Sequence, residues 1–185
     1  MALSDITARI ALAEQAAGRA PGSVRLIAVS KVQPIERVVA VLESGHRVFG
    51  ENYVQEASGK WPDLRARFGA VAVHMIGPLQ SNKAKVAVDL FDAIHTLDRL
   101  SLAQKLAGLQ QARGGLPQLF VQVNTGAEPQ KAGVLPADLA GFLRDCRALE
   151  LAPVGLMCIP PEDQDSTPHF ATLAQMAADH GLQGL

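Results

Sequence analysis

Lys31 has the most distinctive chemical position in this sequence. It follows residues 24–29, an apolar segment short enough to form a buried strand, with only Ser30 between them. An ammonium group at the end of such a strand would be partly desolvated, which favours the neutral amine and makes it a nucleophile towards a carbonyl carbon. A lysine whose side chain only extends from a strand end to water would look the same in the sequence. Both interpretations therefore stay open.

Other polar side chains also follow apolar segments. Ligands of parallel α/β folds gather at the carboxyl ends of the strands, so these positions are candidate binding residues. His74 either contacts a ligand or only completes a hydrogen bond at a strand end. Asn52 and Asn124 are either ligand donors or turn formers, and the turn role is the commoner one. The strand-end group is Ser30, Lys31, Glu51, Asn52, His74, Gly77, Asn124, Met157, Pro160 and Pro161.

Several kinds of site are excluded by the sequence patterns. The five histidines and two cysteines show no spacing typical of metal ligands, so we expect no metal site. The sequence has no GxGxxG or GxxxxGKS/T loop for nucleotide phosphates and no GxSxG nucleophile elbow. The sequence therefore does not support a dinucleotide-dependent enzyme or a serine hydrolase.

The composition predicts one soluble domain in a reducing compartment. The 185 residues are 48% hydrophobic and carry 17 Lys+Arg against 18 Asp+Glu, a formal net charge of −1. This balance of charges provides no electrostatic field that would attract nucleic acid or a membrane surface, so neither is an expected partner. Cys146 and Cys158 form no CxxC pair, and residues 1–8 lack the features of a signal peptide. We therefore expect a cytoplasmic protein with free thiols.

Six apolar segments alternate with segments of helical periodicity. Pro34, Pro136 and Pro168 suit first helical turns, and Pro62 is expected to kink or restart the helix that it interrupts. The predicted strands cover residues 24–29, 46–49, 71–76, 93–97, 119–123 and 154–159. Apolar strands connected through helices predict an α/β fold with a parallel sheet.

Two architectures satisfy this alternation, an open doubly wound sheet and a closed (β/α)8 barrel. A barrel normally takes about 250 residues. This chain provides six strand–helix units, and residues 182–185 are expected to be a connection that leads to no further element. Composition and periodicity do not choose between the two architectures.

Five blocks of this sequence resemble the pyridoxal phosphate homeostasis protein family. They occur in order and at compatible spacing along nearly the whole chain, and the second and third blocks are the most specific. The blocks are residues 26–31 (LIAVSK), 49–56 (FGENYVQE), 74–83 (HMIGPLQSNK), 123–133 (VNTGAEPQKAG) and 155–160 (GLMCIP). The resemblance implies a TIM-type (β/α)8 barrel similar to the N-terminal domain of alanine racemase, with pyridoxal 5′-phosphate (PLP) as cofactor.

The resemblance also assigns roles to residues. The lysine of the first block carries PLP as a Schiff base in that family, and here this lysine is Lys31. Asn52, His74 and Met157 lie at strand ends within the other blocks, so we expect them to flank the cofactor, with Met157 as an adaptable apolar contact. An imine requires a neutral amine where water is limited, which agrees with the position of Lys31.

Members of this family continue beyond the matched blocks with two more strand–helix units. These units carry a Ser-Met-Gly-Met-Ser-like and an Arg-Ile-Gly-like segment for the cofactor phosphate. The resemblance therefore implies a single PLP-binding barrel domain over residues 1–185, truncated after six strand–helix units. We expect weak PLP binding, because a phosphate dianion needs several backbone N–H groups or a helix N-terminus. Two open sheet edges also predict a chain that aggregates, or a monomer that forms a weak homodimer.

The family resemblance implies a carrier or regulator in vitamin B6 and amino-acid homeostasis, with apo-PLP enzymes as candidate recipients. The alternative is a PLP-dependent amino-acid racemase, a reaction that generally needs two bases on opposite faces of the substrate. In the alanine racemase relatives the second base is a tyrosine of another domain, whereas Tyr53, the one tyrosine here, is more simply a packing or capping residue. We therefore prefer the carrier. A fragment without a function of its own is the third alternative.

Overall fold

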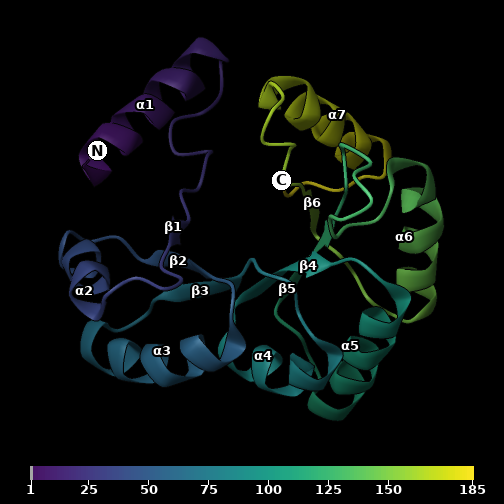
Figure 1. The fold of residues 1–185 in the computed structure, drawn as a ribbon, viewed down its shortest axis with the longest axis horizontal. Helices are drawn as coiled ribbons and strands as arrows, with labels where there is room; N and C mark the ends of the chain where they lie inside the picture. Colours follow the sequence, from purple (N-terminus) through teal and green to yellow (C-terminus); the bar gives the residue numbers. More distant parts are fainter. Residues whose placement is uncertain (1) are drawn as a thin grey trace.

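The computed structural model describes residues 2–185 and shows parallel strands that alternate with helices (Figure 1). The strands are β1 (Ala28–Val29), β2 (Val48–Glu51), β3 (Ala72–Met75), β4 (Ala93–Leu97), β5 (Gln118–Gln122) and β6 (Gly155–Met157). The helices are α1 (Leu3–Ala16), α2 (Ile35–Glu43), α3 (Val54–Phe68), η1 (Ser81–Lys83), α4 (Ala84–Leu90), α5 (Leu100–Arg113), η2 (Pro136–Asp138), α6 (Leu139–Ala148) and α7 (Ser166–Asp179). Within residues 2–185, no helix combines the length and the apolar character needed to cross a membrane.

The order of the strands distinguishes the two architectures that the sequence left open. The order is β1-β2-β3-β4-β5-β6, and every neighbouring pair is parallel. A doubly wound sheet reverses its order at a switch point, whereas a (β/α)8 barrel adds each strand beside the previous one. The observed order is therefore the barrel type. In the part of the chain that the structure describes, β1 and β6 do not pair with each other, so the sheet is open and curved, with helices on its outer side (Figure 1).

The hydrophobic core lies between the outer face of the sheet and the helices, and α3 shows how a helix is held there. The ring of Trp61 on α3 packs against Phe49 of β2, with 4.9 Å between ring centroids. The helix continues through Pro62, so the expected restart at this residue is wrong. Pro62 is exposed, whereas Trp61 and Leu64 on either side of it are buried and anchor both halves of the helix.

β1 is shorter than the apolar segment predicted for it. β1 is an edge strand that pairs only with β2, and its register covers Ala28 and Val29. Upstream, the backbone N–H groups of Val24 and Gly22 donate to the carboxylate of Glu14 at 2.6 and 3.0 Å. These hydrogen bonds, first that of Val24, lower the pKa of Glu14. Glu14 thus fastens α1 to the segment that leads into β1.

The last residues of the chain pair with the other edge of the sheet. Gly184 forms a parallel bridge with Gly155, and its carbonyl oxygen accepts from the N–H of Leu156 at 3.1 Å. A Cβ atom on Gly155 would lie 2.3 Å from the carbonyl oxygen of Gly184, so the two backbones approach as closely as glycine allows. The expected connection at residues 182–185 therefore pairs with β6 through its backbone.

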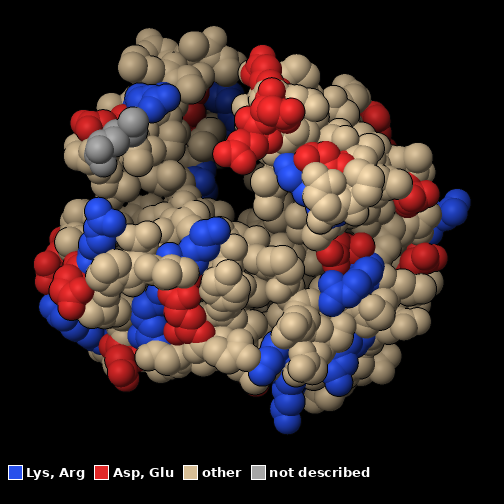
Figure 2. All heavy atoms as spheres, viewed as in Figure 1, with Lys and Arg blue, Asp and Glu red and all other residues tan. Residues whose placement is uncertain are grey.

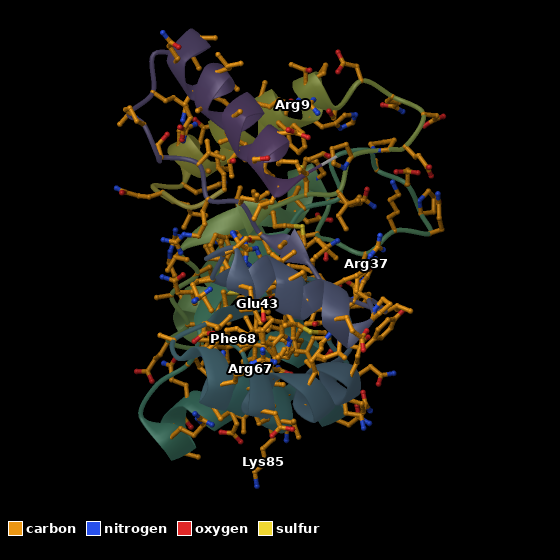
Figure 3. All side chains as sticks on the ribbon, turned by 90° about the vertical axis from the view of Figure 1, so that its left-hand side faces the viewer. Arg9, Arg37, Glu43, Arg67, Phe68 and Lys85 are labelled. Atoms are coloured by element: carbon orange, nitrogen blue, oxygen red, sulfur yellow. The ribbon has the colours of Figure 1, made fainter. Side chains whose placement is uncertain are left out.

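The outer helices are also linked through their exposed side chains. Arg67 of α3 and Glu43 of α2 form an ion pair at 3.1 Å, and Figure 3 shows them on the side of the molecule where these helices lie next to each other. Both side chains are more than half exposed, at 58% and 56%. We therefore expect this pair to contribute little to stability.

Candidate functional site

Lys31 lies immediately after β1, at the carboxyl edge of the sheet, and its side chain is exposed. The sequence predicted a partly desolvated amine, and that expectation is wrong for the structure described here. The physical reason is the position of β1 at the edge of the sheet, where only β2 lies beside it. The amine of Lys31 is consequently accessible to a ligand from solvent.

The backbone on both sides of Lys31 is fixed, although the lysine side chain is exposed. Ser30 is buried, and its N–H donates to the carbonyl oxygen of Gly50 at 3.0 Å. Val32 has a φ of +56°, a left-handed conformation that is rare for a β-branched residue. Its N–H donates to Oε1 of Glu56 on α3 at 2.8 Å. The structure therefore holds a lysine between one buried residue and one strained residue.

A buried ion pair lies directly under this segment. Glu51 at the end of β2 is fully buried, and its Oε1 lies 2.6 Å from Nζ of Lys60 on α3. The same oxygen accepts from Oγ of Ser30 at 2.7 Å and from Nε1 of Trp61 at 3.0 Å. The other oxygen, Oε2, is buried and has no hydrogen-bond partner within residues 2–185.

Sequence reasoning recognised Glu51 only as a strand-end residue, and it missed Lys60 and Trp61. The available signal was the spacing of Glu56 and Lys60, which are four residues apart and so lie on one face of a helix. The side chains of Lys60 and Glu56 are 9% and 29% exposed, so this face borders the buried side of the helix. Two charged residues on such a face require partners, and the sequence alone does not show that β2 and the segment after β1 supply them.

His74 is part of a histidine pair inside the sheet. Its Nδ1 lies 2.9 Å from Nε2 of His95 on β4, and the ring of His95 stacks on Phe120 of β5 at 4.2 Å between centroids. Burial lowers the pKa of His74, an effect that the charge of Asp92 partly opposes. Burial also lowers the pKa of His95 to about 4, with a smaller contribution from His74. Both rings are therefore neutral at physiological pH.

Asn52 lies next to a pocket of about 260 Å³ between the β2–α3 and β3–α4 connections. Its half-buried side chain lines this pocket together with Tyr53, Met75 and Lys83. The backbone of Gly77 packs closely on the same residue, since a Cβ atom on Gly77 would lie 2.5 Å from Cα of Asn52. Asn52 is thus held in place by backbone packing.

The two remaining strand ends have different roles. Asn124 forms a turn, because its Nδ2 donates to the carbonyl oxygen of Glu128 at 2.8 Å and its Oδ1 accepts from the N–H of Glu128 at 3.2 Å. The turn interpretation of Asn124 is confirmed. Met157 is partly buried at the end of β6, and its carbonyl oxygen accepts from the N–H of Val123 at 2.8 Å.

The four residues expected to bind cofactor all lie at the carboxyl ends of strands, but they are not interlinked. No hydrogen bond within residues 2–185 joins any two of Lys31, Asn52, His74 and Met157. Figure 2 shows the surface hollowed between the part of the molecule that carries α1 and the part that carries α7. The same described range contains no group of three or more metal-ligating side chains.

The sequence matches one protein family along nearly its full length. The family described as "Alanine racemase, N-terminal domain" matches residues 2–182. The pyridoxal phosphate homeostasis protein of Pseudomonas aeruginosa is 41% identical over an alignment of 186 positions, which covers 97% of this chain and 79% of that protein. The protein of the same name from Vibrio cholerae is 38% identical over 178 residues, covering 95% of this chain and 75% of that protein.

Solved structures agree with these matches. PipY of Synechococcus elongatus PCC7942 without PLP aligns with a TM-score of 0.78 at 38% identity and covers 94% of this chain and 81% of PipY. PipY with PLP bound aligns with a TM-score of 0.74 at 33% identity, covering 94% and 82%. An alanine racemase of Clostridium difficile, at 11% identity and a TM-score of 0.66, shares the fold over 95% of this chain and 48% of the racemase.

Proposed function

Because this chain belongs to the pyridoxal phosphate homeostasis proteins of the alanine racemase N-terminal domain family, we propose that it binds PLP and acts as a carrier or regulator of this cofactor. The observation that carries the proposal is the fixed segment around Lys31, which presents one exposed primary amine at the carboxyl edge of a barrel-type sheet. PipY, a structural relative at 33% identity, was solved with PLP bound.

The residues of this chain fit the reactive end of the cofactor. PLP supplies an aldehyde that condenses with a primary amine. We assign this amine to Lys31 rather than to Lys60, because Nζ of Lys60 is already held by Glu51, Glu56 and the carbonyl oxygen of Ser30 at 2.6, 3.1 and 2.9 Å. The side chain of Lys31 is exposed and lies on the same edge of the sheet as the other strand-end residues.

We assign three further residues to the proposed binding site. Asn52 directly follows β2, and His74 is the last residue but one of β3; we assign both side chains to the sides of the cofactor ring. His74 is neutral because burial lowers its pKa, so its ring would act as a hydrogen-bonding group without a charge. Met157, at the end of β6, is the proposed apolar contact.

The racemase alternative receives less support. Four alanine racemase structures that align with this chain are 11% to 18% identical to it, so they show a shared fold only. Tyr53, the one tyrosine that could act as a second base, is 55% exposed and lines the pocket beside Asn52. We therefore keep racemisation as an outcome to be tested.

The partners that we propose are PLP itself, apo forms of PLP enzymes as recipients, and a second copy of this chain that binds weakly. The exposed edge strand supports self-association, because Val29 on β1 is 50% exposed and β1 has a neighbour on one side only. Sedimentation velocity over a range of concentrations should show a monomer with a weak monomer–dimer equilibrium. A single species that does not change with concentration would contradict the proposed self-association.

Trapping the cofactor on the protein tests the main proposal. The protein is incubated with PLP, reduced with borohydride and digested, and we expect mass spectrometry to find the adduct on the peptide that contains Lys31. The Lys31→Ala variant should lose this adduct. Lys85→Ala is the matched control, because Lys85 is exposed on α4 and points away from the molecule in Figure 3. An adduct mainly on another lysine would refute the proposal.

A second assay separates the carrier from the racemase. The PLP-loaded protein is incubated with L-amino acids, and the D-enantiomers are measured. We expect no turnover above that of free PLP. Turnover that disappears in Lys31→Ala and falls sharply in Tyr53→Phe would favour the racemase instead.

A further inference from the structure

We propose that the buried pair Glu51 and Lys60, together with Glu56, positions the cofactor lysine by fixing the backbone on both sides of it. This inference rests on the proposed function of Lys31. None of the three side chains is assigned to the cofactor, so they are positioning residues. They act through Ser30 and Val32, the two neighbours of Lys31 in the chain.

The residue before Lys31 is held by two side chains from different elements. Oγ of Ser30 donates to Oε1 of Glu51 at 2.7 Å, and its carbonyl oxygen accepts from Nζ of Lys60 at 2.9 Å. Glu51 ends β2 and Lys60 lies on α3, so the pair ties the end of β1 to both neighbouring elements. Hydrogen bonds that involve a charged group are the stronger kind. Removing Lys60 would leave both Glu51 and the carbonyl oxygen of Ser30 without this donor.

The residue after Lys31 is held in a conformation that it does not prefer. Val32 is β-branched and has a φ of +56°, yet its side chain is 75% exposed, so no packing of this side chain accounts for the strain. Such a conformation persists only where the surroundings over-determine it, and strained residues cluster at functional sites. Two hydrogen bonds restrain it here: the N–H of Val32 donates to Oε1 of Glu56, and the N–H of Gln33 closes a turn onto the carbonyl oxygen of Ser30 at 3.3 Å.

The energetics of the pair indicate a role in geometry rather than in stability. The side chain of Glu51 is 0% exposed and that of Lys60 is 9% exposed, and a buried ion pair of this kind is often replaceable by apolar residues without loss of stability. One oxygen of Glu51 accepts hydrogen bonds from Ser30 and Trp61 and pairs with the ammonium group of Lys60, while the other oxygen is buried with no hydrogen-bond partner within the described chain. Burying this ion pair costs desolvation energy, and the pair fixes the position of the segment before and after Lys31.

The same contacts explain why two nearby lysines have different roles. Nζ of Lys60 donates to the carbonyl oxygen of Ser30 and to Oε1 of Glu56, and it forms an ion pair with Glu51. It is therefore fully engaged in holding Ser30 and the two glutamates. Lys31 is exposed on the segment that these contacts hold.

The test compares variants by the rate at which PLP forms the adduct on Lys31. Lys60→Met removes the donor to Ser30 and Glu51 with a side chain of similar length, and we expect the rate to fall at least about tenfold. Glu56→Ala removes the acceptor for Val32 and should also slow the formation of the adduct on Lys31. Glu56→Gln retains an oxygen for Val32 and should stay within about threefold of the parent. Adduct formation is followed by visible absorbance and by the borohydride-trapped peptide.

Arg65→Met is the matched control on the same helix. Arg65 donates to the carbonyl oxygens of Val71 and Leu90 and pairs with Asp92 at 2.6 Å, so it ties α3 to the opposite end of the sheet. Its loss should lower the melting temperature, measured by circular dichroism, while the rate of adduct formation stays within about threefold of the parent. Hydrogen exchange of the Val32 amide is measured without PLP. Only Lys60→Met and Glu56→Ala should increase its exchange rate.

The possible outcomes separate this inference from the proposed function. If the parent forms no adduct on Lys31, the proposed function fails, and the inference fails with it. If the parent forms the adduct and both Lys60→Met and Glu56→Ala react at the rate of Arg65→Met, only the inference is overturned. If Lys60→Met does not fold, Glu56→Ala decides, because the side chain of Glu56 is 29% exposed and its removal leaves the Glu51 pair in place.

Discussion

Acid is expected to destabilise this fold through the histidine pair inside the sheet. Burial lowers the pKa of His95 to about 4 from an ordinary value of 6.5, and it lowers the pKa of His74 as well. Between about pH 4 and pH 6.5 the unfolded chain therefore binds more protons than the folded chain, so the unfolding free energy rises with pH in this window. The contribution of His95 is fully present above pH 6.5 and is lost as the pH falls towards 4.

The size of the effect follows from the pKa of His95. A shift from 6.5 to about 4 corresponds to a loss of about 2 kcal/mol of unfolding free energy at about pH 5 and about 3 kcal/mol at about pH 4. His74 adds to the loss, since burial lowers its pKa in the same direction. A domain with an unfolding free energy of about 5–15 kcal/mol would lose a measurable part of it.

Urea unfolding at about pH 8 and at about pH 5 measures this loss, with the fluorescence of Trp61, the one tryptophan, as the probe. His95→Gln replaces the imidazole by a neutral group, so it should be less stable at the higher pH and should lose about 2 kcal/mol less than the parent on acidification. His180→Gln, at the end of α7, is the matched control, because it removes a histidine that lies outside the histidine pair. Equal losses in the parent and in His95→Gln would refute the reasoning.

Three substitutions test the backbone positions around the site, each by urea or thermal unfolding. Gly77→Ala should destabilise the protein by about 1–3 kcal/mol, because the new Cβ would lie 2.5 Å from backbone atoms of Asn52, and an unchanged stability would contradict this packing. Gly59→Ala in α3 meets nothing within 4 Å and should stabilise by about 0.5–1 kcal/mol, so a loss of stability would be inconsistent with the helix described. Val32→Gly removes a strain of about 1–2 kcal/mol but makes the unfolded chain more flexible, so stability should change by less than about 1 kcal/mol, and a larger loss would argue against the strain.

The alternation of strands and helices could be predicted from the sequence because burial imposes a pattern on each element. The strand at residues 93–97 was predicted with the bounds that the structure gives, and all five of its residues are buried. Ala93, Ile94 and Leu97 are apolar, as expected for a strand covered on both faces, and the buried His95 and Thr96 have hydrogen-bond partners. Agreement is weaker at residues 24–29, where only Ala28 and Val29 pair, because an edge strand has fewer neighbours to define its ends.

The chemistry of the site was only partly readable from the sequence. Lys31 was singled out by its position after an apolar strand and by the resemblance of its block to a family, and its exposure in the structure differs from the expected desolvation. The histidine pair was missed because His74 and His95 are 21 residues apart in the chain, and only the pairing of β3 with β4 brings their rings together. No local pattern encodes such a contact.

The sequence by itself determined the α/β class, the number of strand–helix units and the identity of the candidate lysine, since these depend on local periodicity and on short motifs. Only the tertiary structure decided the order of the strands and the partners of the buried charges. Strand order depends on which edges pair in space, and the ion pair of Glu51 with Lys60 joins a strand to the helix after it through a geometry that neither segment contains alone. The segment that carries Lys31 is held by contacts with residues 20 to 30 positions further along the chain, which become neighbours only when the sheet and α3 have packed together.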